Sequence, residues 1–259
     1  MLSLLGLLVA GIICGFLNAA ASSGSAITLP ILLALGLPPA VANGTNRLPV
    51  IVGMFTAFVN FQKAKVIPWG FTLKLLPVFL IFAAAGASFA SVLPMEQVRT
   101  LVHIAIVMAL LLLLLKPNRW LAASDDQLPS QPSWKLLLLM AAVGAWAGLI
   151  ILDSGTYLLI TLVLVGGLSL RQANAIKVVL IGSATLLAVV VFLIQGEVNW
   201  FYGAPLMLGS AIGGWLGAKL ALGPAARQWI YRLLLGALSL EAVLSLWASF
   251  HPVENRLMM

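Results

Sequence analysis

Two polar interruptions of apolar sequence hold the residues that could do chemistry. The first interruption consists of four small residues, Ser22, Ser23, Gly24 and Ser25. The second lies in the other half of the chain and consists of Asp153, Ser154, Gly155 and Thr156. A helix broken in this way exposes backbone N–H groups that hydrocarbon cannot satisfy. Such breaks survive where protein or a water-filled cavity surrounds them, so we expect each one to line a binding site.

The helix starts that follow these breaks have chemistry suited to an anion. The free N–H groups and the positive dipole end of a helix attract negative charge. The serine hydroxyls could contact the same ligand, or they could only cap the helix. Asp153 has the same alternative role as a cap. Because a carboxylate between apolar segments is costly at membrane depth, we expect Asp153 to accept a proton or to bind a cation during coupling.

A second set of polar residues begins the segment after each break. The set in the first half consists of Asn43, Thr45, Asn46 and Arg47. The set in the second half consists of Asn174 and Lys177. Arginine offers an oxyanion a planar fork of donors, and lysine offers a point charge. We therefore expect Arg47 and Lys177 to contact an anionic substrate or to pair with Asp153. The alternative is that both cations extend to the membrane interface as anchors.

The composition is that of a membrane protein. Hydrophobic residues make up 62% of the 259 residues, and charged residues make up 8%. The mean hydropathy is +1.12, whereas a soluble domain carries about 25% charged residues. No charged residue and no basic leader region precede Arg47, so we interpret the chain as starting with a retained helix. The net charge of +7 fits basic cytoplasmic loops, and no basic cluster with interleaved aromatics predicts nucleic-acid binding.

The apolar runs predict ten helical segments in two halves. The predicted segments are 2–21, 25–37, 40–62, 68–93 and 97–115, and then 134–152, 156–168, 170–195, 199–222 and 226–250. They divide the chain into a first repeat at 1–116, a polar linker at 117–133 and a second repeat at 134–252. Residues 2–37 and 134–168 could each span the membrane or form a re-entrant hairpin. Each hairpin would join a broken helix to a short one.

The loop charges predict that the two repeats are inverted. Gly24, Asn43 and Trp69 fall on Gly155, Asn174 and Trp200 at one constant offset along the chain. Equivalent loops nevertheless have opposite charge: Lys63 and Lys65 follow the third segment, whereas Glu197 follows the eighth. By the positive-inside rule these loops face opposite sides of the membrane. We therefore expect an all-α polytopic protein with cytoplasmic loops at 63–65, 116–135 and 219–232 and with both termini outside.

The region LPILLALGLPPAVANGTNRLPVIVGMFTAFVNF, together with the duplication, resembles the TauE/SafE family of sulfite exporters. The matching positions are Pro30, Leu32, Gly36, Pro39, Ala42, Gly44 and Thr45. The resemblance implies a secondary transporter of small anions, chiefly sulfur oxyanions such as sulfite and thiosulfate, or organosulfonates. Many members have a glycine-rich first break, whereas this chain has more hydroxyl groups there and a carboxylate in the second break.

The sequence thus predicts an anion transporter of a bacterial cytoplasmic membrane. We expect alternating access, with protons or sodium as candidate coupling ions, the lipid bilayer as surroundings and a homodimer as one candidate assembly. A passive anion channel or uniporter of the same fold, or a carrier of small carboxylates, is the alternative. A membrane-embedded enzyme would need clustered acidic and histidine residues, and the chain has seven acidic residues and two histidines. No P-loop, catalytic triad or metal-ligand spacing is present, so we expect no cofactor and no metal.

Overall fold

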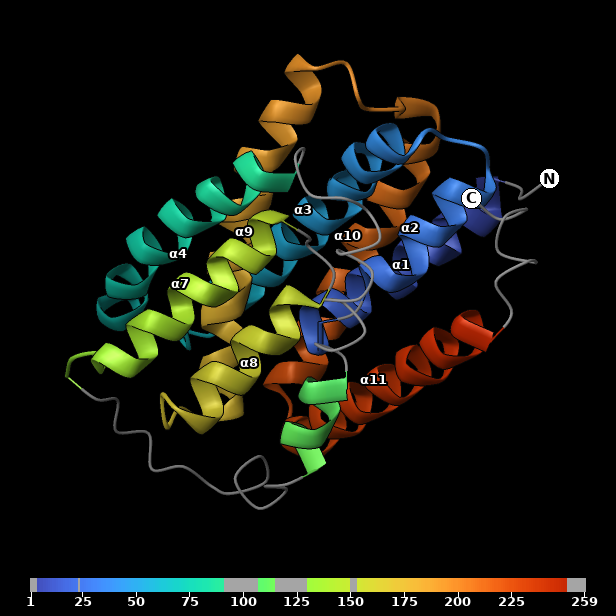
Figure 1. Ribbon diagram of the computed structural model, residues 1–259. Helices are drawn as coiled ribbons and strands as arrows, with labels where there is room; N and C mark the ends of the chain where they lie inside the picture. Colours follow the sequence, from blue (N-terminus) through green and yellow to red (C-terminus); the bar gives the residue numbers. More distant parts are fainter. Residues whose placement is uncertain (1–3, 23, 91–106, 115–129, 150–152, 251–259) are drawn as a thin grey trace.

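The computed structural model describes residues 4–22, 24–90, 107–114, 130–149 and 153–250, which are helices and turns without a strand. The helices of the first half are α1 (Leu4–Ala20), α2 (Ser25–Ala34), α3 (Pro39–Lys63) and α4 (Trp69–Ala90), followed by a helical stretch at 107–114. The helices of the second half are α7 (Trp134–Leu149), α8 (Ser154–Leu164), α9 (Leu170–Ile194), α10 (Trp200–Leu222) and α11 (Ala226–Phe250) (Figure 1). The predicted helical class is confirmed. Most of the predicted linker 117–133, and most of the predicted segment 97–115, lie outside the described residues.

The second helix of each half is short. Helix α2 has 10 residues and α8 has 11, which gives about 15 Å of helix, half of the hydrocarbon thickness. Helix α2 ends earlier than predicted because Gly36 turns the chain in a left-handed conformation with φ of 84°. Gly167 does the same after α8 with φ of 68°. Helix α8 begins two residues before the predicted start, because the carbonyl of Asp153 already accepts from the N–H group of Thr156 at 2.8 Å.

The third and fourth helices of the two halves match in position. Helices α3 and α9 have 25 residues each, and their first and last residues are related by the same offset that relates Gly24 to Gly155. Helices α4 and α10 begin with tryptophan at this offset. Equal helix bounds support the predicted duplication, because turns as well as apolar runs coincide.

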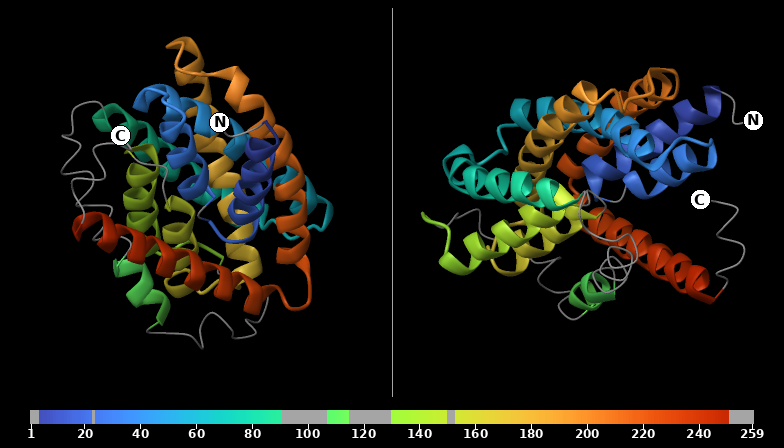
Figure 2. Two further views of the ribbon diagram at one scale, coloured as in Figure 1. Left: turned by 90° about the vertical axis from the view of Figure 1, so that its right-hand side faces the viewer. Right: turned by 45° about the horizontal axis from the view of Figure 1, so that its top comes forward.

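The first helix of each half packs against the fourth helix of the other half. Helix α1 lies along α10, and α7 lies along α4, on two flanks of the molecule (Figures 1 and 2). Glycine makes both contacts close: a Cβ atom at Gly213 would lie 1.9 Å from the carbonyl oxygen of Ile12, and one at Gly148 would lie 1.9 Å from that of Ala83. Small residues of this kind let helix backbones approach within a membrane.

The outer surface is apolar and fits a lipid environment. Among the described residues, Trp69–Ser88, Leu170–Ile194 and Trp200–Leu222 are long and apolar enough to cross a membrane. Several large apolar side chains of α9 are exposed, namely Leu186, Leu187, Val190, Val191 and Ile194. The fold is therefore that of an all-helical membrane protein, with a set of buried polar residues in its interior.

Candidate functional site

The two breaks meet inside the protein. A Cβ atom at Gly155 would lie 2.5 Å from the hydroxyl oxygen of Ser22 and 3.1 Å from Cδ of Lys177. Ser22 follows α1, Gly155 belongs to the first turn of α8, and Lys177 belongs to α9. Figure 1 shows the end of α1 beside the start of α8. We call this meeting point the central site. Its predicted members in the described chain are buried: Ser22, Gly24, Ser25, Asp153, Ser154, Gly155, Thr156, Asn174 and Lys177. Ser23 lies outside the described residues.

Asn18 holds the first break in shape. Its side-chain oxygen accepts from the N–H group of Gly24 at 3.0 Å, and its amide nitrogen donates to the sulfur of Cys14 at 3.4 Å. A Cβ atom at Gly24 would lie 2.2 Å from the carbonyl oxygen of Cys14, so only glycine fits there. No side chain in the described part caps the start of α2, where Gly24 is the N-cap residue. The capping role considered for Ser22 and Ser25 is therefore absent.

The second break is held by a strained residue. Asp153 is the N-cap residue of α8 with φ of 55°, and its carboxylate makes no capping hydrogen bond to the helix. A non-glycine residue rarely adopts this left-handed conformation, although aspartate tolerates it better than most. The side chain is 3% exposed. The structure thus shows no side-chain capping hydrogen bond from Asp153 to α8, and strain of this kind is typical of functional positions.

Side chains of helix α9 donate hydrogen bonds to the carbonyl groups at the end of α1. The ammonium group of Lys177 donates to the carbonyl oxygens of Asn18 at 2.8 Å and Ala21 at 2.6 Å. The amide nitrogen of Asn174 donates to the carbonyl oxygen of Ala19 at 2.9 Å. The last carbonyl groups of a helix have no partner within it and form its negative end. The second half therefore supplies the donors that the broken helix of the first half lacks.

The polar residues of α3 do not repeat this arrangement. The offset that pairs Gly24 with Gly155 places Asn46, not Arg47, opposite Lys177. The side-chain oxygen of Asn46 accepts from the hydroxyl group of Thr28 in α2. Thr45 accepts from the N–H group of Asn199 at 2.9 Å, in the turn before α10. The remaining predicted residue of this set, Asn43, is half-buried.

Arg47 is buried without an acceptor among the residues that the structure describes. It is 4% exposed, and it makes no hydrogen bond or ion pair with any residue that the structure describes. Its guanidinium carbon lies 5.8 Å from the ring centre of Phe192 near the end of α9. Phe192 is fifteen residues beyond Lys177, which is about 22 Å along the helix axis. The structure therefore separates the two cations that the sequence placed in similar positions beside the breaks.

Further buried polar atoms have no hydrogen-bond partner within the described ranges. At the central site these are the hydroxyl oxygens of Ser22 and Thr156 and the side-chain oxygen of Asn174. On α3 they are Nε of Arg47 and the amide nitrogen of Asn46. Buried polar groups in native proteins are nearly always satisfied, so such a set indicates a ligand or water site.

Sequence reasoning missed Asn18 and Thr28 as parts of the site. Asn18 is the one amide in an uncharged first helix, and that isolation was the signal available for it. Thr28 carried no signal, because a threonine in a short apolar helix is ordinary. The offset itself could have paired Lys177 with Asn46.

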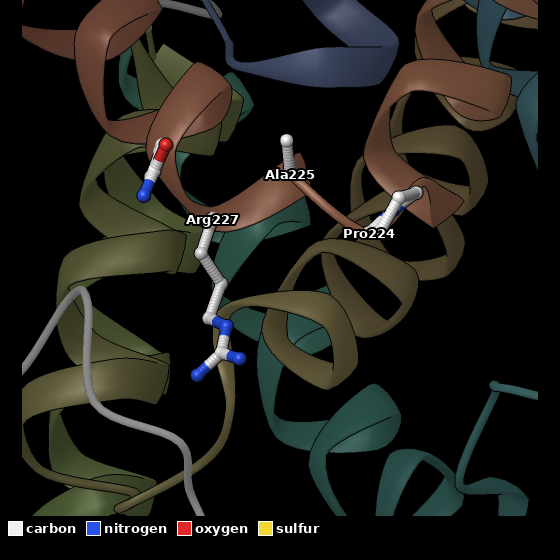
Figure 3. A pocket seen from close by; sticks show the side chains of 4 residues that line it. Pro224, Ala225 and Arg227 are labelled. Carbon is white, nitrogen blue, oxygen red and sulfur yellow. The ribbon is translucent and has the colours of Figure 1, made fainter.

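The molecule also has hollows away from the central site. One of about 400 Å³ lies at the start of α11 and is lined by Pro224, Ala225, Arg227 and Gln228 (Figure 3). Another of about 350 Å³ lies between the 107–114 stretch, α7 and α8, and most of its lining is apolar. No residue predicted to bind substrate lines either hollow.

Comparisons with known proteins give one family model and several relatives named as membrane transporters. The family described as sulfite exporter TauE/SafE matches residues 7–244. A "probable membrane transporter protein ORF9" of Sinorhizobium sp. is 28% identical over 96% of this chain and 94% of its own length. A "probable membrane transporter protein" of Haemophilus influenzae is 28% identical over 82% of each chain. The "probable membrane transporter protein YfcA" of Escherichia coli is 26% identical over 85% of this chain and 81% of its own. No solved structure matches the chain.

Proposed function

We propose that this membrane transport protein moves a small sulfur oxyanion or organosulfonate by alternating access. The chain belongs to the sulfite exporter TauE/SafE family. The protein would cross the bacterial cytoplasmic membrane several times and act as a secondary transporter. The family description supports the sulfur oxyanion. The names of the three relatives support transport without indicating a substrate.

The observation that carries the proposal is an excess of buried positive charge. Among the described residues the buried charged side chains are Arg47, Lys177 and Asp153. Two cations and one carboxylate leave one positive charge in excess. An uncompensated buried charge is costly in the low dielectric of a protein interior. A bound anion would compensate this charge, whereas a bound cation would increase the excess.

The two groups of predicted residues have different parts in this proposal. At the central site the hydroxyl groups of Ser22 and Thr156 and the helix starts of α2 and α8 would receive the anion, since these hydroxyl groups have no partner in the described chain. Neighbouring members would shape this site, namely Gly24, Ser25, Ser154, Gly155 and Asn174. On α3, Arg47 would bind the anion at a second position, away from the central site, with the help of Asn43, Thr45 and Asn46. Asp153 would carry the coupling proton.

The inverted repeat would supply the two states that alternating access needs. The first repeat would cover 1–116 and the second 134–252, and 117–133 would link them. Both breaks lie at the contact between the halves, where a rocking motion would change access to them. The exchange of α1 and α7 between the halves supports such a two-fold relationship.

Cysteine labelling tests the inverted repeat. Ala64→Cys and Val198→Cys lie in equivalent turns after α3 and α9, and the native Cys14 is buried and should stay unreactive. We expect a membrane-impermeant reagent to label position 64 only from the cytoplasm and position 198 only from outside. Labelling of both positions from one side would contradict the repeat without bearing on the substrate.

Flux into proteoliposomes tests the function. The panel would contain sulfite, thiosulfate, a sulfonate such as sulfoacetate and small carboxylates, with imposed pH or sodium gradients and empty liposomes as the control. We expect a sulfur oxyanion or sulfonate to accumulate against its own gradient when a pH gradient is present. Equilibration that never exceeds the external concentration would instead support the passive channel or uniporter. Preference for a carboxylate would reject the sulfur assignment.

A further inference from the structure

The carbonyl oxygens at the end of α1 form an arrangement that suits a monovalent cation. Asn18 and Ala21 direct their main-chain oxygens at a single point, which the ammonium nitrogen of Lys177 occupies at 2.8 and 2.6 Å. Lys177 is fully buried. The hydroxyl oxygen of Ser22 follows directly in the chain and has no partner among the described residues. Carbonyl oxygens at the C-terminal end of a broken helix are the ligands by which transporters hold sodium.

We infer that Lys177 fills a monovalent-cation site with its own ammonium group, so that the central site binds no sodium ion. A sodium ion can couple transport because it binds on one side of the membrane and leaves on the other. An ammonium group tethered to α9 cannot leave. This site therefore cannot link the flux of substrate to a sodium gradient.

The ammonium group also ties the two halves together. Its acceptors belong to α1 of the first half, and its own helix belongs to the second half. In a sodium-coupled site, binding of the ion would make this connection and its release would break it. Here the ammonium group is covalently attached to α9, so the connection is not broken by the release of an ion. The inference goes beyond the proposed function, because it does not depend on which anion is carried.

A plain helix cap is the competing explanation. Basic side chains near a helix end often satisfy its last carbonyl groups without any link to ion binding. Arg171 does this on the same helix, since its guanidinium donates at 2.6 Å to the carbonyl oxygen of Leu222, the last residue of α10, at an exposed position. Removing a helix cap destabilises the protein to the same extent in every salt. If the ammonium group occupies a cation site, its removal empties the site, and a suitable cation that enters the site restores the stability of the protein.

Two variants separate these explanations. Lys177→Ala removes the ammonium group and leaves space beside the carbonyl oxygens, whereas Lys177→Met removes the charge and keeps the volume filled. Arg171→Ala is the matched control for losing an exposed cap. Thermal unfolding of each purified protein would be measured in sodium, lithium, potassium or choline chloride at equal ionic strength.

We expect the thermal unfolding midpoint of Lys177→Ala to be about 5 °C or more higher in sodium, lithium or potassium chloride than in choline chloride. A ligand present well above its dissociation constant stabilises the folded state by this amount. The wild type, Lys177→Met and Arg171→Ala should show no such difference. Equal midpoints for Lys177→Ala in all four salts would overturn the inference and leave Lys177 as a cap.

The wild type provides a second test should Lys177→Ala fail to fold in any salt. We expect its flux of the transported anion, driven by a pH gradient, to be the same in sodium and in choline. A wild-type flux that requires sodium would overturn the inference. Because the unfolding experiment needs no substrate, its failure would leave the anion-transport proposal intact, and failure of the flux panel would leave the cation site testable.

Discussion

Lys177 and Arg47 are the two buried cations of the described chain, and their surroundings differ completely. Lys177 lies at the central site and donates to two main-chain carbonyl groups. Arg47 lies near the end of α9, beside the ring of Phe192, without an acceptor among the described residues. Both follow a helix break at almost the same distance in the sequence. Their position relative to the break therefore does not determine their role.

The difference lies in which groups satisfy the donors. A cation whose donors are met by the protein stabilises the fold, and removing it leaves buried carbonyl groups without partners. A buried cation without acceptors makes the folded protein less stable on its own, and it is satisfied when an anion binds. We therefore assign Lys177 mainly to the scaffold and Arg47 mainly to the substrate. Four variants test this assignment, in order of their expected effect on the dissociation constant of the anion.

Arg47→Gln should have the largest effect on binding. A charge-assisted hydrogen bond contributes about 1.5–3 kcal/mol, so we expect sulfite to bind roughly ten- to a hundredfold more weakly. The unfolding midpoint should stay the same or rise, because a buried charge without a partner is removed. Titration calorimetry with sulfite measures the affinity, and Arg171→Gln is the exposed control. Normal affinity in Arg47→Gln would exclude Arg47 from the site.

Gly155→Ala should have the next largest effect, because its Cβ atom would lie 2.5 Å from the hydroxyl oxygen of Ser22. Overpacking of about 1 kcal/mol at this contact would weaken sulfite binding about fivefold. Gly70→Ala is the matched control, since no atom lies within 4 Å of its Cβ position. Equal affinities of the two variants would mean that the contact between the breaks does not shape the binding site.

Lys177→Met should affect stability more than binding. Two buried carbonyl groups lose a charged donor, so we expect a loss of about 1–3 kcal/mol in the free energy of unfolding. The affinity for sulfite should fall about threefold or less, which is below about 1 kcal/mol. Denaturant unfolding and calorimetry on one preparation compare the two quantities. A loss of affinity as large as that of Arg47→Gln, with unchanged stability, would reverse the assignment of the two cations.

Asp153→Asn should have the smallest effect on binding and a specific effect on coupling. The amide resembles the protonated acid, so we expect sulfite binding and counterflow to stay near wild-type levels. Accumulation driven by a pH gradient should be lost, because proton uptake and anion binding are linked reciprocally. Counterflow and gradient-driven uptake in the same proteoliposomes separate the two effects. Unchanged gradient-driven uptake would remove Asp153 from the coupling mechanism.

The described helices could be predicted from the sequence, although the two short helices end earlier than expected, because helix formation depends on local properties. Uncharged runs of about 20 residues require helices in hydrocarbon, since every backbone group must be satisfied within its own segment. Gly36 and Gly167 end the short helices because they adopt a left-handed turn. The expected helix 226–250 coincides with α11. The constant offset between the halves is likewise a property of the sequence, since it links tryptophan, glycine and asparagine positions.

Only the tertiary structure decided which polar groups meet. Lys177 reaches the carbonyl groups of Asn18 and Ala21, which lie 159 and 156 residues away in the chain. The acceptors are main-chain atoms, which every residue has, so no residue type marks them. Arg47 has the sequence context of a similar donor, yet its position on α3 directs it to Phe192. The sequence therefore determined where the chain breaks, because hydrophobicity and backbone conformation act locally. The packing of the two halves determined that the N–H donors of Lys177 are used by the protein and that those of Arg47 are left for a ligand, because hydrogen bonding depends on positions in space.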